Sequence, residues 1–279
     1  MKRNIDKTIV SGLSKSDLWM SKIKNDCMNQ NVFLAIRNNQ IDFYHNGGRL
    51  FCFDRKGFQT HLKYASVLDF AEKDYLTESE LGQYRLISDF NAYYSRIKEN
   101  CSNYSGIEAL GVSEIYHKFS YLAERDVVVL DIEVSFESLN KGKNQDRIDL
   151  LLFNKQTRTL QFIEAKHYSN KELWSNSKPK VIDQINRYES QIQKKKSVIL
   201  SEFASYVNSI NSIFNVSLPK PIDVDNKVTL LIFGFDNDQK NGRLRDLIIK
   251  NPIYYGVKSY QIGNIKRMVP ENLWKAKEL

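Results

Sequence analysis

The chain has 279 residues, a formal net charge of +8, 42% hydrophobic and 27% charged residues, which excludes a largely disordered or low-complexity protein. No apolar run approaches the roughly 18 residues of a membrane span, and residues 1–16 lack the apolar core of a secretory signal. The three cysteines lie far apart, which predicts reduced thiols and no disulfide framework. We therefore expect a cytoplasmic protein without a membrane partner.

Predicted strands dominate the first part of the chain. Apolar and aromatic runs at 31–36, 40–44 and 49–54 are separated by Asn38-Asn39 and Asn46-Gly47-Gly48, which are typical of tight hairpin turns. Helix-forming residues from Glu78 to Asn100 predict a helix that links this part to the next. We divide the chain into a β-rich N-terminal unit with its linking helix, residues 1–104, and a second domain, residues 105–279.

The second domain alternates predicted helices and strands. In chain order these are a helix at 105–123, strands at 127–136, 147–154 and 159–166, helices at 179–195 and 198–214, a strand at 228–235, a helix at 240–250 and a strand at 255–262. A basic loop, Lys141-Gly142-Lys143-Asn144, joins the first two strands. This order predicts an α/β fold around a mixed central sheet.

Two of these strands bring charged side chains together. Side chains alternate between the faces of a strand, so Glu164 and Lys166 share a face, and a hairpin centred between Gln156 and Thr157 pairs Asp149 with Glu164. Neighbouring carboxylates repel each other unless a cation lies between them, and hard oxygen ligands suit Mg²⁺. A lysine on the same face can orient a water or stabilise charge on a phosphate. The alternative is a surface hairpin with an ordinary charge cluster.

Residues 148–166 resemble the core motif of the PD-(D/E)xK nuclease superfamily. Ile148-Asp149 is followed, after fourteen residues, by Glu164-Ala165-Lys166, and Ile148 stands where the family name has proline. The segment from Gln184 to Tyr188 resembles the Q-x-x-x-Y motif of RecB-type nucleases. The resemblance covers about residues 105–262 and implies a restriction-endonuclease-like αβββαβ core with a mixed central sheet.

The resemblance also implies a metal site and a set of catalytic residues. Mg²⁺ or Mn²⁺ would be bound by Asp149, Glu164, the backbone carbonyl of Ala165 and an acid of the preceding helix, Glu114. Glu108 and Glu133 are rival candidates for that acid. The other catalytic residues would be Lys166, which serves the attacking water, and Gln184 and Tyr188.

Positive charge is concentrated directly after this motif. From Lys166 to Lys196 there are eight basic and three acidic residues, and we take Lys178, Lys180 and Arg187 as candidate nucleic-acid contacts. A basic protein of this size favours a polyanionic partner. The alternative is that these long side chains are only solvated and that the charge reflects a lysine-rich composition.

The sequence therefore predicts a Mg²⁺-dependent nuclease that hydrolyses phosphodiester bonds, in DNA rather than RNA, and the superfamily suggests a role in restriction or anti-phage defence. One alternative is a module that keeps the nuclease fold to bind nucleic acid within a larger complex without cutting it. Another is an interaction protein whose basic face is incidental. The N-terminal unit would bind substrate or a partner, and a partner protein or a second copy of the chain is left open.

Overall fold

The computed structural model describes residues 2–66, 86–136, 147–175 and 179–279. The chain forms two compact units. The smaller unit comprises Ile5–Gly106, and the larger unit comprises Ile107–Leu279 together with the N-terminal residues up to Asn4. The chain passes from the smaller to the larger unit after Gly106, two residues beyond the predicted boundary at 104. The sequence analysis did not assign the residues before Ile5 to the second unit. No helix in the described part of the chain is long and apolar enough to cross a membrane.

The smaller unit is built on a four-stranded antiparallel sheet. Its strands follow one another in space as in sequence: β1 (Phe33–Arg37), β2 (Gln40–His45), β3 (Gly48–Asp54) and β4 (Gly57–Gln59). Asn39 and Asn46 adopt positive φ angles of 54° and 46° in the two predicted hairpin turns, as turns of this kind require. Phe43 is fully buried and its ring lies 5.9 Å from that of Trp19.

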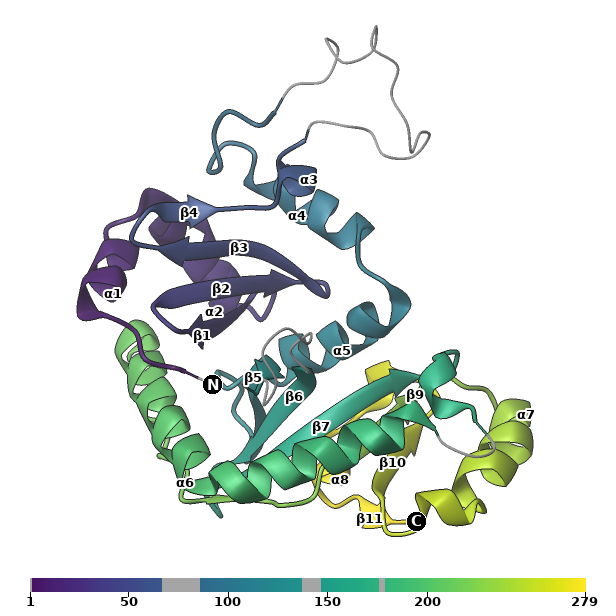
Figure 1. Ribbon diagram of the computed structural model, residues 1–279. Helices are drawn as coiled ribbons and strands as arrows, with labels where there is room; N and C mark the ends of the chain where they lie inside the picture. The colour runs from purple at the N-terminus through teal and green to yellow at the C-terminus, as the bar shows by residue number, and fades with distance from the viewer. Residues whose placement is uncertain (1, 67–85, 137–146, 176–178) are drawn as a thin grey trace, which may run out of the picture. The chain divides into compact units, whose positions relative to one another are not determined.

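The smaller unit also contains helices, of which the sequence analysis predicted only the last, and that one in part. Before the sheet lie α1 (Lys7–Ser14), the π-helix η1 (Trp19–Ile23) and α2 (Lys24–Met28), and after it lie α3 (Leu62–Ala65) and α4 (Tyr94–Asn103). The unit therefore combines its four-stranded sheet with helices (Figure 1). Buried residues four apart, among them Trp19 and Ile23, form the apolar side of these helices.

The predicted helix at 78–100 was only partly correct. Residues 86–93 form no helix, and α4 begins at Tyr94 and continues to Asn103. The first part of the prediction, residues 78–85, lies outside the described residues.

The larger unit contains a seven-stranded mixed sheet with helices, so the predicted α/β class is confirmed. The strand order is β11-β10-β9-β7-β6-β5, and β8 pairs with β7. The strands are β5 (Val127–Ser135), β6 (Arg147–Asn154), β7 (Thr159–His167), β8 (Asp223–Val224), β9 (Thr229–Phe233), β10 (Lys258–Ile262) and β11 (Lys277–Glu278). The helices are α5 (Ile107–Lys118), η3 (Lys171–Leu173), α6 (Lys180–Phe214), α7 (Asn237–Gln239), η4 (Lys240–Ile249), η5 (Pro252–Tyr254), η6 (Ile265–Arg267) and α8 (Pro270–Trp274).

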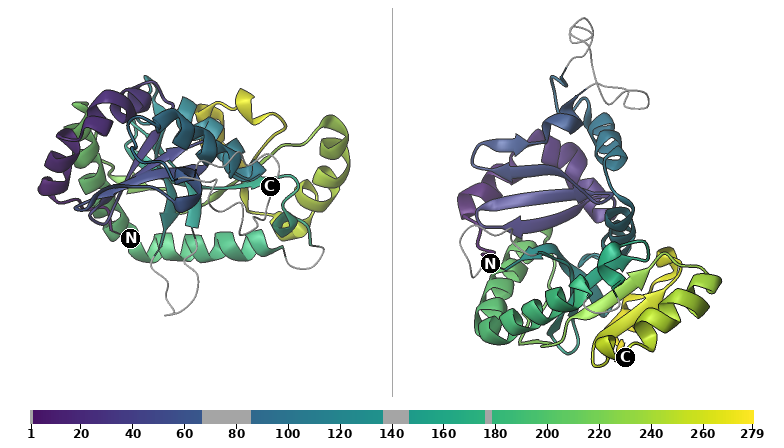
Figure 2. Two further views of the ribbon diagram at one scale, coloured as in Figure 1. Left: turned by 90° about the horizontal axis from the view of Figure 1, so that it is seen from above. Right: turned by 45° about the vertical axis from the view of Figure 1, so that its right-hand side comes forward.

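Strand direction divides this sheet into two parts. Strands β5, β6 and β7 are antiparallel, whereas β9 runs parallel to β7 and β10 parallel to β9. The carboxyl ends of β7, β9 and β10 therefore lie at one edge. The first part of helix α6 runs along one face of the sheet, and the helix then bends sharply away (Figures 1 and 2). The helices predicted at 179–195 and 198–214 correspond to the two parts of α6, which meet at a kink where Lys195 has non-helical φ and ψ angles of −115° and 17°.

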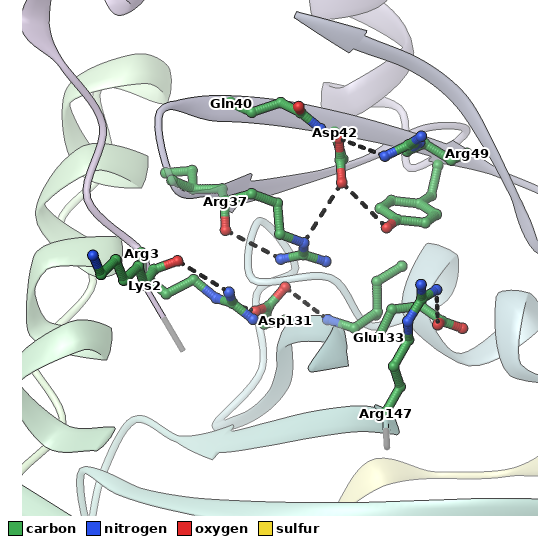
Figure 3. A network of polar contacts seen from close by, with 12 residues as sticks. Lys2, Arg3, Arg37, Gln40, Asp42, Arg49, Asp131, Glu133 and Arg147 are labelled. Carbon is green, nitrogen blue, oxygen red and sulfur yellow. Dashed lines mark hydrogen bonds and ion pairs between the residues drawn. The ribbon is translucent and has the colours of Figure 1, made fainter. Parts of the chain in front are cut away.

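A buried ion pair ties the N-terminal residues to the larger unit (Figure 3). Arg3 Nε donates to Asp131 Oδ2 of β5 at 2.9 Å, and the two side chains are 4% and 0% exposed. The backbone N–H of Arg3 donates to Glu202 Oε2 of α6, and its guanidinium lies 5.7 Å from the ring centre of Phe203. Arg3 is therefore part of the buried interior of this unit.

Candidate active site

The β6–β7 hairpin has the register that the sequence predicted. Leu150 pairs with Ile163 and Leu151 with Phe162, so continuing the register by one residue places Asp149 opposite Glu164. The Oδ2 atom of Asp149 accepts a hydrogen bond of 2.7 Å from the backbone N–H of Ala165. The carboxylate of Asp149 therefore reaches across to β7 and lies beside the residue that carries the second acid.

The turn between these strands explains why the register is fixed. The Oδ1 atom of Asn154 accepts hydrogen bonds from the backbone N–H groups of Gln156 and Thr157, the pattern by which asparagine stabilises a turn. Arg158 completes the turn with a φ of 59°. A slip of one residue would move every side chain to the other face of the strand, so this short turn determines that Asp149 meets Glu164.

Glu164 and Lys166 are both buried, with 1% and 6% of their surface exposed. The Lys166 ammonium lies 2.8 Å from Glu164 Oε1 and 2.9 Å from Glu172 Oε2. Glu172 comes from η3, at whose start Asn170 Oδ1 accepts a hydrogen bond from the Glu172 N–H. Lys166 is therefore held between two carboxylates, one from its own strand and one from the turn that follows.

An acid of helix α5 also lies beside β7. Glu108 Oε2 accepts hydrogen bonds from the His167 N–H at 2.8 Å and from Asn170 Nδ2 at 2.9 Å. Glu114 lies elsewhere on this helix, partly exposed and 3.4 Å from Lys266 Nζ. Six residues separate the two acids, which turns them to different faces of a helix. Of the acids considered on this helix, Glu108 is the one that the structure brings to the end of β7.

Among the residues that the structure describes, carboxylates outnumber cations in the group around Lys166. Asp149, Glu164, Glu108 and Glu172 interact with the Lys166 ammonium or with one another. Burial, together with the charges of Glu108 and Glu172, raises the pKa of Glu164 to about 7, although Lys166 lowers it. Burial and the charge of Glu164 raise the pKa of Asp149 well above its usual range. Burial opposes the charged form of Lys166, but the carboxylates outweigh it and raise its pKa.

One carboxylate oxygen at the centre of this group lacks a partner. Glu164 Oε2 is buried and accepts no hydrogen bond from any described residue. Leaving a buried acceptor unsatisfied is costly, and more so when it is charged. A hard divalent cation would satisfy both this oxygen and the surplus of negative charge, so Glu164, Asp149 and the carbonyl of Ala165 fit Mg²⁺ as a set of donors.

The protein would supply only part of the coordination of such an ion. Within residues 2–66, 86–136, 147–175 and 179–279, no group of three or more His, Cys, Asp or Glu side chains is arranged to hold a metal. Mg²⁺ usually keeps several waters and is bound through one or two carboxylates plus substrate phosphates. A two-carboxylate site at Asp149 and Glu164 is consistent with this mode of Mg²⁺ binding.

Gln184 and Tyr188, on helix α6, lie against the start of β6. The Tyr188 hydroxyl donates to the backbone carbonyl of Arg147 at 2.7 Å, and Gln184 Nε2 donates to that hydroxyl at 2.9 Å. This contact joins α6 to the strand two residues before Asp149. Both side chains thus support the backbone that positions Asp149.

Of the remaining predicted residues, the structure describes Glu133, Lys180 and Arg187. Glu133, on β5, has a φ of 48° and an ion pair of 3.4 Å with Arg147, and its charge contributes to the raised pKa of Asp149. Lys180 and Arg187 are exposed on α6. Lys178 and the basic loop 141–144 lie outside the described residues.

The sequence analysis missed Glu172 and Asn170. The pattern Asn-x-Glu after a strand is a signal for a local turn, and the structure forms one there. The signal does not show that the turn folds back onto Lys166, because that depends on Glu108 holding Asn170 from a helix about sixty residues away.

No family model, curated protein or solved structure matches this chain.

Proposed function

We propose that this protein is a Mg²⁺-dependent nuclease that hydrolyses phosphodiester bonds, with DNA as its substrate. The observation that carries the proposal is the buried Oε2 atom of Glu164, which has no hydrogen-bond partner among the described residues. It lies in a group with Asp149 and Lys166 where negative charge exceeds positive charge. Such a group gains most from binding a divalent cation.

We also propose that the larger unit has a restriction-endonuclease-like core. In support, helix α5, strands β5 to β7, helix α6 and strand β9 follow one another in the order αβββαβ. The first three strands are antiparallel and β9 is parallel to β7. The residues of the Asp…Glu-x-Lys motif lie at the end of the β6–β7 hairpin.

The roles of the residues follow from their charges and contacts. When bound, Mg²⁺ polarises a phosphoryl oxygen of the substrate, and Asp149, Glu164 and the carbonyl of Ala165 would hold it. The raised pKa of Lys166 keeps its side chain protonated, so it donates hydrogen bonds and stabilises negative charge on the phosphate. Glu172 and Glu164 fix the direction of that ammonium.

The positive net charge and the exposed Lys180 and Arg187 on α6 support a polyanionic substrate. The choice of DNA over RNA and a role in restriction or anti-phage defence rest on the sequence resemblance.

The test is incubation of the purified chain with linear, circular and single-stranded DNA and with RNA, with and without Mg²⁺ or Mn²⁺. We expect metal-dependent cleavage of DNA. Asp149→Asn, Glu164→Gln and Lys166→Ala should each lower the rate by about 100-fold or more, the effect of removing a preorganised electrostatic group. Asp223→Asn is the matched control, because this exposed acid forms its ion pair with Lys196 and should leave the rate unchanged. Wild-type turnover in any of the three site variants would refute the role given to that residue.

A second candidate function is a binding module that does not cut. It is favoured by the ammonium of Lys166, which already pairs with two carboxylates, and by the lack of a three-residue metal cluster among the described residues. DNA binding that weakens steeply with salt, without products in either metal, would favour this candidate over the nuclease.

A further inference from the structure

A cavity of about 440 Å³ lies at the carboxyl ends of β7, β9 and β10 in the larger unit. Its volume is in the range of small-molecule sites, and the carboxyl ends of parallel strands are where open α/β sheets bind ligands. Its lining includes the apolar side chains of Ile107, Leu110, Phe235 and Ile265 and the ammonium of Lys266.

One wall of the cavity adjoins the candidate active site. His167 lines the cavity and directly follows Lys166 on β7. Its ring packs against Gly234, which has a φ of 82° and where a Cβ atom would lie 2.1 Å from His167 Nε2. Only glycine allows this approach. A ligand in the cavity therefore lies at the same strand end as Lys166, with the side chains of His167 and Lys166 on opposite faces of the sheet.

A row of aromatic rings begins at this cavity. The ring centre of Phe235 is 6.3 Å from that of Tyr168, which is 4.9 Å from that of Trp174. The guanidinium of Arg243 lies 4.1 Å from the ring centre of Trp174. These aromatic side chains are half-buried, and Trp174 Nε1 donates to the Tyr168 carbonyl at 2.8 Å. The row follows the turn that carries Glu172.

Charge at the cavity and the row favours an anionic occupant. The side chain of Lys266 is 70% exposed, Arg267 follows it in the sequence and is exposed, and the exposed Arg243 lies over the ring of Trp174. Glu114 is the one acid that lines the cavity, and its carboxylate lies against Lys266. Aromatic rings beside cationic groups are the combination by which proteins bind single-stranded nucleic acid.

We propose that the cavity and the aromatic row bind an unpaired segment of nucleic acid, with one base in the cavity and the following bases against Tyr168 and Trp174. In a duplex both faces of each base are covered by its neighbours, so only an unpaired base can stack on a protein ring. As a statement about substrate class, this rests on the proposed nuclease function. The binding itself does not depend on cleavage and can be measured without it.

The experiment measures fluorescence anisotropy of a labelled twelve-nucleotide oligothymidine in EDTA, so that no metal-dependent cleavage occurs, and compares it with a duplex of equal length. We expect tighter binding of the single strand. Trp174→Ala should weaken it by about 5- to 150-fold, the effect of losing one stacked base. Trp174→Phe keeps a ring and should retain most of the affinity. Leu110→Trp, which fills the cavity, should weaken binding, whereas Tyr255→Ala removes an exposed ring elsewhere in the unit and should not.

The outcomes separate this inference from the nuclease proposal. Wild-type affinity in folded Leu110→Trp and Trp174→Ala, or duplex binding as tight as that of the single strand, would overturn the inference whether or not the protein cuts DNA. Tight, variant-sensitive binding of the single strand without cleavage in Mg²⁺ or Mn²⁺ would uphold the inference and refute the nuclease. If Trp174→Ala does not fold, Leu110→Trp alone decides.

Discussion

Replacing Arg3 by methionine should strongly destabilise the larger unit. Methionine keeps much of the side-chain volume but removes the cation that lies 2.9 Å from Asp131 Oδ2. The Asp131 side chain is completely buried, so its carboxylate would lose a cation that compensates its charge. Removing one partner of a buried pair costs about 3–5 kcal/mol. For a unit of this size that lowers the melting temperature by about 6–20 °C.

Differential scanning calorimetry of the whole chain measures this shift in the transition of the larger unit. Lys196→Met is the matched control, because its pair with Asp223 is shorter, at 2.7 Å, but both side chains are about half exposed, and such pairs contribute at most about 1 kcal/mol. Arg3→Met combined with Asp131→Leu should recover most of the loss, since no charge is then left buried. Equal shifts for Arg3→Met and Lys196→Met would show that burial does not set the energy of the pair.

Three further results are expected. Gly111→Ala should destabilise the larger unit by about 1–3 kcal/mol in urea unfolding, because the new Cβ would lie 2.2 Å from the ring of Phe233, whereas Gly106→Ala, with open space, should be neutral. Burial lowers the pKa of His45, so the unfolded chain binds the proton more readily than the folded chain does. The free energy of unfolding should therefore fall as the pH drops below about 6.5. His45→Gln should make the free energy of unfolding less dependent on pH in this range. Arg187→Glu should weaken DNA binding and reduce its salt dependence, and an unchanged slope would place the contact elsewhere.

The part of the fold that could be predicted depends on local patterns. The β6–β7 hairpin was predicted to the residue because its strands are apolar, its turn is short, and Asn154 stabilises that turn through its own neighbours. Helix α1 was missed because its buried residues, Ile9 and Leu13, form a single pair at helical spacing. The helix predicted at 78–100 was only partly correct, because Ser88, Asp89 and Asn91 favour turns over helix and the structure has turns at 90–93.

The candidate site likewise contains residues that local sequence patterns predict and residues that they do not. Period-two alternation places Glu164 beside Lys166, and hairpin symmetry adds Asp149, so these three follow from the sequence. Glu108 and Glu172 depend on how α5 and the turn after β7 pack, which no short-range pattern records. The preference for Glu114 over Glu108 had no support in helix periodicity, since the two point to different faces and either could have met the sheet.

The division of the chain into units also sets an order of events during synthesis. The chain leaves the larger unit after Asn4, builds the smaller unit, and returns at Ile107. Arg3 and its partner Asp131 are 128 positions apart, which at about 5–20 residues per second is a delay of roughly 6–26 s on the ribosome. The smaller unit can fold within that time, before Asp131, the partner of Arg3, has been synthesised. Closure of the buried pair is therefore a late step, because strand β5 is synthesised only after the whole smaller unit.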